Sequence, residues 1–236
     1  MQQLLKNHQL AVAVEMYLHP DLRTRLDTLR DMVTVFEQKL HAPEATLATL
    51  SRKQLAALVW LQRRQVAPGV YDIPLLSPTF CDMIRQETSQ WPFTGNSQEP
   101  AHLRCPEAVL HEVCPQLGRT VWELFRAALG PVYTLIHGTV PTAVAAAQLT
   151  RYTLERNSLG GWHQDEDSDF TAVVELAPEL HTGGGADVMS APLTITSVPT
   201  LAKGHALLFC GKTTHHRGRP ITEGVRDLLV FWTESK

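Results

Sequence analysis

Cysteine is scarce in this sequence, which has four cysteines among 236 residues: Cys81, Cys105, Cys114 and Cys210. No two of them form a CxxC pair, and so few thiols do not suggest a disulfide framework for a chain of this length. We therefore expect reduced cysteines in a reducing compartment. A bridge between Cys105 and Cys114 is the alternative that an oxidising compartment would allow.

Long apolar runs are also missing. No segment approaches the roughly 18 uninterrupted apolar residues that a membrane helix needs. The first residues, MQQLLKNHQLAVAVEMYLH, contain one lysine and an apolar patch that Glu15 interrupts, so they lack the apolar region and cleavage site of a signal peptide. We expect no membrane partner and a cytoplasmic location, with the nucleus as the alternative.

Neither sign of charge dominates the composition. The chain has 21 Lys and Arg against 24 Asp and Glu, which gives a formal net charge of −3. Such a balance provides no general attraction to nucleic acid or to acidic membranes, and no basic stripe is present. Nucleic acid is therefore not an expected partner, and nothing in the sequence indicates the oligomeric state.

The first third of the chain is predicted to be helical. One helix is indicated by an apolar stripe with alternating spacings of four and three, made of Leu22, Leu26, Leu29, Val33, Phe36 and Leu40. Pro20 and Asp21 mark its start, and Pro43 ends it. An earlier helix is predicted at about residues 3–17.

A capping box of Ser51 and Gln54 predicts another helix, which continues through Leu61 with Arg63 and Arg64 in its last turn. We assign residues 1–66 to an N-terminal helical region and residues 67–236 to a second domain. The helices of the first region either form a separate bundle or pack against the sheet of the second.

Strands and turns dominate the second domain. A strand at VYDIPLL precedes a helix capped by Ser77, a loop over residues 92–106, and a helix over about 116–137 that is broken at Gly130-Pro131. Five later runs predict strands: AAAQLTRYTLER, DFTAVVELA, PLTITSV, HALLFCG and DLLVFWTE. Short strands after helices suggest an α+β fold, with a β-sandwich or barrel supported by helices on one side.

The stretch GGWHQDEDSDFT concentrates the chemistry. His163 and Asp165 are two residues apart, so both side chains share one face if the backbone is extended. A second histidine from the pair His215-His216 would complete a 2-His-1-carboxylate triad, which holds non-haem Fe(II) and leaves positions open for other ligands. The pair leaves open which of its two histidines would be the ligand.

The motifs around these residues resemble those of the Fe(II)- and 2-oxoglutarate-dependent dioxygenases, in the branch of the prolyl and lysyl hydroxylases. The resemblance covers about residues 69–234. Its motifs here are the HxD of His163 and Asp165, the strand DFTAVVEL, the turn Gly183-Gly184-Gly185, the segment HRGRP and Arg226. Upstream, GVYDIPLLSPTFCDMI and LTRYTLER resemble the family's opening strand and helix and the strand before its metal loop.

The resemblance implies a double-stranded β-helix (jelly-roll) core with supporting helices. It implies an enzyme that uses Fe(II), 2-oxoglutarate and O₂, with ascorbate as a further candidate, to hydroxylate a lysyl or prolyl side chain of a protein or peptide. His163, Asp165 and His216 would bind the metal. Arg226 would bind the far carboxylate of 2-oxoglutarate, because a guanidinium grips a carboxylate well, and Tyr152 would contact the same co-substrate.

The family spacing favours His216 over His215 as the metal ligand, since His216 lies four residues before Pro220 and ten before Arg226. In an extended chain, His215 would point the opposite way. Three features depart from the family pattern: Val173 replaces an asparagine, Asp227 replaces a frequent aromatic residue, and the pair Ala186-Asp187 follows the glycine turn. None of these departures affects the three metal ligands.

Glu166, Asp167 and Asp169 are either a solvated loop or an acidic substrate rim that attracts a cationic side chain. Other functions remain as alternatives: a non-catalytic binding module, an oxygenase acting on nucleic acid or a small molecule, and a zinc hydrolase. The absence of basic stripes argues against nucleic acid, and structural zinc prefers four protein ligands where this sequence offers three. Formation of succinate from 2-oxoglutarate would separate an enzyme from a binding module.

Overall fold

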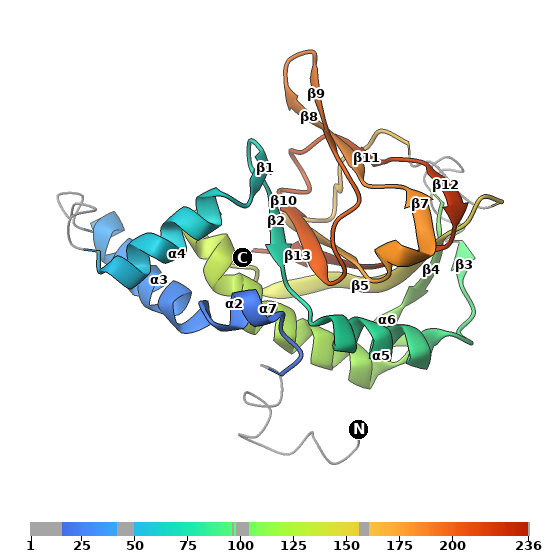
Figure 1. Cartoon of the computed structure of the whole chain (residues 1–236), viewed down its shortest axis with the longest axis horizontal. Helices are drawn as coiled ribbons and strands as arrows, with labels where there is room; N and C mark the ends of the chain where they lie inside the picture. Colours follow the sequence, from blue (N-terminus) through green and yellow to red (C-terminus); the bar gives the residue numbers. More distant parts are fainter. Residues whose placement is uncertain (1–15, 42–49, 96, 98–103, 156–160, 236) are drawn as a thin grey trace.

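The computed structural model describes residues 16–41, 50–95, 97, 104–155 and 161–235. Helices lie along one side of the molecule and antiparallel strands form the other, so the prediction of an α+β fold is confirmed (Figure 1). The predicted end at Pro43 and residues 3–15 of the predicted helix at 3–17 fall outside the described residues, and Met16 and Tyr17 lie in a turn. None of the helices in the described ranges is long and apolar enough to cross a bilayer.

The predicted helix over Leu22–Leu40 is divided into two. Helix α2 spans Pro20–Arg23 and helix α3 spans Leu26–His41. Between them, the amide of Thr24 bonds back to the carbonyl of Pro20 and the amide of Arg25 to that of Leu22, which tightens the chain into a turn. The apolar spacing continues across this turn, so the pattern alone could not reveal it.

Helix α4 spans Arg52–Gln62 and begins at the predicted capping box of Ser51 and Gln54, which is confirmed. The prediction that Arg63 and Arg64 occupy its last turn was wrong, because the helix ends at Gln62 and Arg63 is the C-cap. Arg64 instead reaches Asp21 of α2, with its Nη2 atom 2.8 Å from the carboxylate. This ion pair connects the two helices.

Helix α7, Pro115–His137, continues through Pro131, so the predicted break there was wrong. Proline lacks the N–H that would bond to the carbonyl four residues earlier, which is that of Ala127. Arg30 of α3 supplies a replacement donor, since its Nη2 atom lies 3.4 Å from this carbonyl oxygen. The helix ends at Gly138, whose left-handed φ of 75° suits glycine.

The described N-terminal helices pack into the main core rather than forming a separate bundle. One cluster joins Leu22, Leu26 and Leu29 to Phe125 of α7 and to Phe231 in the sheet. The division between residues 66 and 67 stays a prediction, although the short strand β1 (Gln65–Ala67) crosses it and pairs with β2 (Val70–Pro74).

The main sheet has eight antiparallel strands in the order β1-β2-β10-β6-β13-β5-β4-β3. Beyond β1 and β2, its members are β10 (His205–Phe209), β6 (Phe170–Glu175), β13 (Arg226–Glu234), β5 (Ala143–Tyr152), β4 (Pro106–Val109) and β3 (Thr94–Gly95). Helix α5 (Pro78–Thr88) is capped by Ser77 as predicted, and the short helix α6 (Leu110–Val113) packs against α7. Strand β3 and the start of β4 fall within the predicted loop, so that prediction was wrong there.

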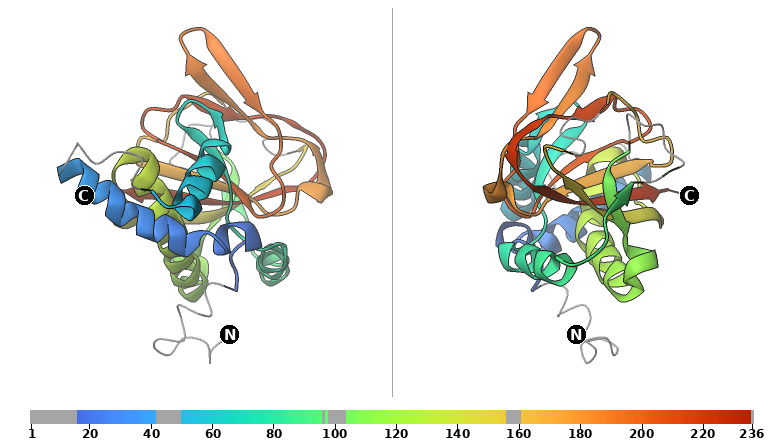
Figure 2. Two further views of the ribbon diagram at one scale, coloured as in Figure 1. Left: turned by 60° about the vertical axis from the view of Figure 1, so that its left-hand side comes forward. Right: turned by 90° about the vertical axis from the view of Figure 1, so that its right-hand side faces the viewer.

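Two smaller sheets complete the strand layer. One has the order β11-β8-β9, from His216–Gly218, Ala186–Ala191 and Thr194–Val198, and the other pairs β12 (Ile221–Gly224) with β7 (His181–Gly183). After β6, the short 3-10 helix η2 (Pro178–Leu180) leads into β7. The hairpin β8–β9 projects from the body of the molecule and carries the fully exposed Leu193 at its turn, with a φ of 60° (Figure 2).

Strand β13 shows how the sheet separates core from cavity. Leu229 and Phe231 belong to the core beneath the helices, whereas Arg226, Leu228, Val230 and Trp232 line a cavity on the opposite face. This is the alternation that a strand imposes on successive side chains. Asp227 accordingly lies on the helix side, where Arg151 and Arg85 of α5 pair with its carboxylate at 2.7 and 3.2 Å.

Candidate active site

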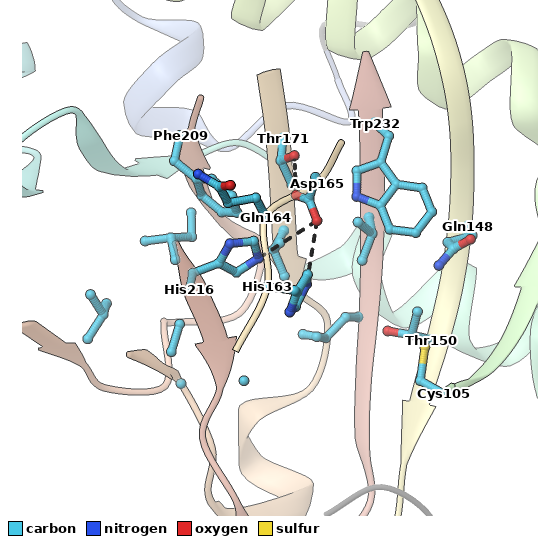
Figure 3. A pocket seen from close by; sticks show the side chains of 18 of the residues that line it. Cys105, Gln148, Thr150, His163, Gln164, Asp165, Thr171, Phe209, His216 and Trp232 are labelled. Carbon is cyan, nitrogen blue, oxygen red and sulfur yellow. Dashed lines mark hydrogen bonds and ion pairs between the residues drawn. The ribbon is translucent and has the colours of Figure 1, made fainter. Parts of the chain in front are cut away.

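A cavity of about 960 Å³ opens between the main sheet and the smaller sheets. Its walls come from β5, β6, β10 and β13, and from the segment that carries His163. Figure 3 shows His163, Asp165 and His216 turned toward one another at one part of this cavity, with Trp232 and Gln148 on the opposite side. The cavity is large enough for a small ligand together with part of a larger one.

The three predicted metal ligands converge. One ligand atom from each of His163, Asp165 and His216 lies within 4.8 Å of the others. The Oδ1 atom of Asp165 is 3.5 Å from Nε2 of His163 and 3.9 Å from Nε2 of His216. A backbone bridge between His163 and His216 holds the two segments that carry these groups side by side.

Both histidines present a lone pair to this point. Nδ1 of His163 is 2.8 Å from the carbonyl oxygen of Gly161, and Nδ1 of His216 is 3.0 Å from that of Thr214. A carbonyl can only accept a hydrogen bond, so each Nδ1 carries a hydrogen, and in the neutral ring Nε2 is the nitrogen with the free lone pair. Such hydrogen bonds commonly fix the tautomer and orientation of metal-binding histidines.

Asp165 is buried and held on its other oxygen. The hydroxyl of Thr171, on β6, donates to Oδ2 of Asp165 at 2.5 Å, which leaves Oδ1 for the histidines. Burial acts to raise the pKa of Asp165, but its interactions with His163, Thr171 and His216 together outweigh this effect, so the pKa lies below its ordinary value. The carboxylate is therefore ionised at neutral pH.

His216 is buried among apolar and carboxylate neighbours. Its burial lowers the pKa below the ordinary histidine value, and this effect exceeds the opposing attraction of Asp165. A neutral imidazole is the form that binds a metal. The donor set of two imidazole nitrogens and one carboxylate oxygen fits Fe(II), whereas a structural zinc site would need a fourth ligand.

His215 lies outside this group. Its ring stacks on Trp162 with a centroid distance of 5.5 Å and an interplanar angle of 1°. The guanidinium of Arg217 covers the same tryptophan, 4.9 Å from the ring centroid. The structure thus places His216, and not His215, beside Asp165, as strand alternation predicts.

Arg226 is buried and lines the cavity, opposite Tyr152 in the register between β13 and β5. Its Nη1 atom donates to the carbonyl oxygen of Gly185 at 3.1 Å, and its Nε atom is 3.0 Å from Oε2 of Glu175. Tyr152 also lines the cavity, and burial raises the pKa of its hydroxyl, which stays protonated. A buried cation beside a protonated hydroxyl suits a carboxylate ligand, although Glu175 shares the charge of Arg226.

Glu166 and Asp167 are exposed and line the mouth of the cavity. Asp169 does not, and its predicted place in an acidic rim was wrong. Its carboxylate lies 2.7 Å from Nζ of Lys212 and accepts hydrogen bonds from the amide and hydroxyl of Ser235 at 2.7 and 2.8 Å. The rim is therefore reduced to Glu166 and Asp167.

Several lining residues were missed by the sequence analysis. Glu175 is the acidic residue of an otherwise apolar strand, which was a signal for a buried ion pair. Gln148 and Thr150 of β5 and Trp232 of β13 also face the cavity, as does Cys105 (Figure 3). Alternation along β5 and β13, counted from Tyr152 and Arg226, could have found the three strand residues.

Two proteins with similar sequences have the same name, PKHD-type hydroxylase. No family model matches the chain. A PKHD-type hydroxylase of Verminephrobacter eiseniae is 27% identical over 177 residues, which are 68% of this chain and 76% of the relative. A PKHD-type hydroxylase of Acidovorax ebreus is 29% identical over 136 residues, which are 52% of this chain and 56% of the relative.

Solved structures share the fold at low identity. A 2OG-Fe(II) oxygenase family oxidoreductase of Burkholderia pseudomallei has a TM-score of 0.57 and 16% identity, and the match covers 78% of this chain and 92% of that one. A prolyl-4-hydroxylase of Pseudomonas putida has a TM-score of 0.56 and 15% identity, with 77% and 99% covered. A prolyl hydroxylase of Trichoplax adhaerens, in complex with a hypoxia inducible factor peptide fragment, has a TM-score of 0.53 and 15% identity, with 78% and 94% covered. The predicted jelly-roll core is confirmed by these likenesses.

Proposed function

We propose that this chain, an Fe(II)- and 2-oxoglutarate-dependent dioxygenase of the prolyl and lysyl hydroxylase-like branch, hydroxylates a lysyl or prolyl side chain of a protein or peptide. The observation that carries the proposal is the convergence of three ligand atoms, from His163, Asp165 and His216, at the wall of a cavity. The hydrogen bonds on Nδ1 of both histidines and the ionised carboxylate of Asp165 suit the binding of a divalent metal.

In this proposal His163, Asp165 and His216 hold the iron. Arg226 and Tyr152 hold the far carboxylate of 2-oxoglutarate. The bound iron and 2-oxoglutarate supply the oxidising chemistry, in which loss of CO₂ from 2-oxoglutarate and reduction of O₂ are coupled to hydroxylation of a C–H bond. Ascorbate is proposed as an additional reductant.

The chain's own residues position these groups and exclude water. Thr171 fixes the carboxylate of Asp165, so the oxygen that faces the histidines does not rotate away. Between the triad and Arg226, the cavity wall is apolar, with Val173 of β6, Leu207 of β10 and Leu228 and Val230 of β13. An apolar wall leaves water few hydrogen-bond partners beside the bound co-substrate. Val173, which departs from the family pattern, contributes to this wall.

Two acidic residues at the mouth of the cavity support the proposal of a cationic substrate. Glu166 and Asp167 are exposed there. Two carboxylates at the entrance attract a lysyl side chain or a basic peptide. The peptide bound to the prolyl hydroxylase of Trichoplax adhaerens supports a polypeptide substrate in this fold.

The test is oxidation of defined peptides. Purified protein is incubated with Fe(II), 2-oxoglutarate and O₂, and with peptides that contain lysine, proline, both or neither in otherwise identical sequences. Mass spectrometry is expected to show the gain of one oxygen atom in a lysine- or proline-containing peptide, together with succinate. His216→Ala is expected to be inactive and serves as the negative control. His215→Ala is the matched variant that is expected to keep its activity. Succinate formation without oxidation of any peptide would contradict a polypeptide substrate, and no succinate at all would contradict the oxygenase activity.

A further inference from the structure

Arg226, the proposed anchor of the co-substrate, already has an anionic partner within the protein. Its Nε atom is 3.0 Å from Oε2 of Glu175. The other carboxylate oxygen of Glu175, Oε1, is 3.2 Å from Nε2 of His181. These three side chains form a continuous cluster, which we call the Arg226–Glu175–His181 cluster.

The cluster is closed to solvent. The side chains of Arg226, Glu175 and His181 are 9%, 2% and 0% exposed. Water therefore screens the two charges poorly, and the charge of each matters to any ligand that comes beside them. Nδ1 of His181 has no hydrogen-bond partner among the described residues. The geometry thus places a ring hydrogen on Nε2, which donates it to Glu175, and offers no acceptor for a second hydrogen on Nδ1.

The glycine turn before β8 holds the cluster in place. Gly185 accepts the hydrogen bond from Nη1 of Arg226. Gly184 has a left-handed φ of 83°, and a Cβ atom there would lie 3.1 Å from Cε1 of His181 and 3.4 Å from Cδ of Arg226. The backbone is thus packed against both side chains, which restricts their movement away from Glu175.

The groups next to Arg226 in the sheet add no positive charge to the cluster. Asp227, the next residue along β13, lies on the other face of the sheet with Arg151 and Arg85. Tyr152, opposite Arg226, is neutral because burial raises its pKa. The positive charge of Arg226 and the negative charge of Glu175 therefore cancel. A carboxylate bound to Arg226 would add a second negative charge a few ångström from Glu175.

We infer that Glu175 limits the affinity of the co-substrate site for a dianionic 2-oxo acid and lets the site accept a 2-oxo acid whose far end is a neutral amide. The inference rests on the proposed function, because it takes Arg226 as the anchor of the far end. An amide is chemically suited to the cluster, since its oxygen accepts from the Nη atoms of Arg226 and its N–H groups donate to Glu175. A carboxylate can make only the first of these contacts and is repelled by Glu175.

The first test measures binding rather than turnover. The dissociation constant of 2-oxoglutarate is determined by calorimetry, without oxygen, for protein loaded with Mn(II). Glu175→Gln keeps the size of the side chain and an oxygen for Nε of Arg226, but it removes the charge. We expect this variant to bind 2-oxoglutarate about tenfold or more tightly, the order of effect of a like charge at such a distance in a buried site.

A matched control is available in the strand layer. Asp187 is also a buried carboxylate paired with an arginine, Arg217, at 2.9 Å, but it lies outside the cavity lining. Asp187→Asn is expected to leave the affinity for 2-oxoglutarate unchanged. A merely structural role for Glu175 would make Glu175→Gln bind 2-oxoglutarate more weakly or equally, and either result would overturn the inference.

A second test needs no variant, so it stands if Glu175→Gln does not fold. The unmodified protein is titrated with 2-oxoglutarate and with 2-oxoglutaramate, whose far end is an amide. We expect the two dissociation constants to agree within about threefold, because repulsion from Glu175 offsets the attraction of Arg226 for a carboxylate. A preference for 2-oxoglutarate of a hundredfold or more would overturn the inference.

Failure of the inference and failure of the proposed function give different results. If the metal-loaded protein binds 2-oxoglutarate, and Arg226→Ala removes the binding while Glu175→Gln does not strengthen it, the inference alone is overturned. If the metal-loaded protein binds neither 2-oxo acid, both are overturned. Tighter binding by Glu175→Gln together with loss of binding by Arg226→Ala supports both.

Discussion

The backbones of His163 and His216 are hydrogen-bonded to each other. The amide of each donates to the carbonyl oxygen of the other at 2.9 Å, in an isolated antiparallel bridge. More than fifty residues separate them in the chain, yet this bridge sets the distance between their rings, whose centroids are 4.4 Å apart. The geometry of the triad therefore depends on main-chain pairing as well as on side-chain rotamers.

Removing any one member of the triad is expected to abolish metal-dependent turnover. His163→Ala, Asp165→Ala and His216→Ala each leave two ligands, which cannot hold a divalent metal firmly. His215→Ala should retain turnover, because its ring stacks on Trp162 instead. Metal content and succinate formation are measured for all four variants. An inactive His215→Ala with an active His216→Ala would contradict the ligand assignment.

Arg226→Ala is expected to weaken binding of 2-oxoglutarate far more than binding of the metal. Truncating a charged partner in a buried pair typically costs roughly 2 to 5 kcal/mol. The variant also leaves Glu175 buried without its partner, so its thermal stability is measured first. Calorimetry with 2-oxoglutarate then gives the change in affinity. Equal affinities in the variant and the unmodified protein would remove Arg226 from the co-substrate site.

Gly184→Ala should damage the co-substrate site through the backbone. The new Cβ would lie 3.0 Å from Oγ1 of Thr200 and would press on His181 and Arg226, at a left-handed φ of 83°. Gly69→Ala is the matched control, since its φ is 72° and no atom lies within 4 Å of the new Cβ. Both variants should lose about 1 kcal/mol or more of stability from backbone strain. Only Gly184→Ala should also weaken 2-oxoglutarate binding, measured by calorimetry.

Neutralising Glu166 and Asp167 together should raise the Michaelis constant for a basic peptide. Succinate formation in the absence of peptide should change little, because these exposed carboxylates are not among the proposed ligands of the metal or of 2-oxoglutarate. The rate with peptide is measured against salt, since a field from exposed charges fades as the Debye length falls below about 10 Å. If the rate of peptide turnover by the unmodified protein does not depend on salt, the two residues belong to a solvated loop and not to a substrate rim.

Asp169 should stabilise the fold at neutral pH and lose this effect in acid. Lys212 and Ser235 hydrogen-bond to its carboxylate and lower its pKa from 3.8 to about 2. A pKa that is lower in the folded state adds stability above the unfolded pKa, and this stability disappears as pH falls from about 4 to about 2. The group is partly exposed, so the contribution is about 1 kcal/mol or less. Melting temperatures of the unmodified protein and Asp169→Asn should differ at pH 7 and converge toward pH 2.

Motif spacing could predict the triad positions because two of its members lie in one short segment. His163 and Asp165 share a face by simple alternation, and the resemblance to the oxygenase family, with its spacing to Pro220 and Arg226, indicates His216. The capping box at Ser51 and Gln54 was similarly local, and the helix began there. Local signals of this kind do not depend on the rest of the fold.

Long-range contacts explain the errors. The helix continues through Pro131 because Arg30, about a hundred residues away, bonds to the carbonyl that proline leaves free. Asp169 leaves the cavity mouth because Lys212 and Ser235 bind it. Glu175 could be noticed as an acidic residue in an apolar strand, but its pairing with Arg226 required the fold. A single sequence contains no direct record of such partners.

The shared core has a consequence for the size of the folding unit. Leu22, Leu26 and Leu29 of the first helices pack in the same cluster as Phe125 of α7, which in turn backs the sheet. Tyr133 of α7 donates to the carbonyl oxygen of Thr171, whose hydroxyl donates to the carboxylate of Asp165. A fragment that begins at residue 67 would therefore expose the apolar surface of α7 against which these leucines pack. It should aggregate, and its affinity for iron should fall even though every proposed ligand is still present.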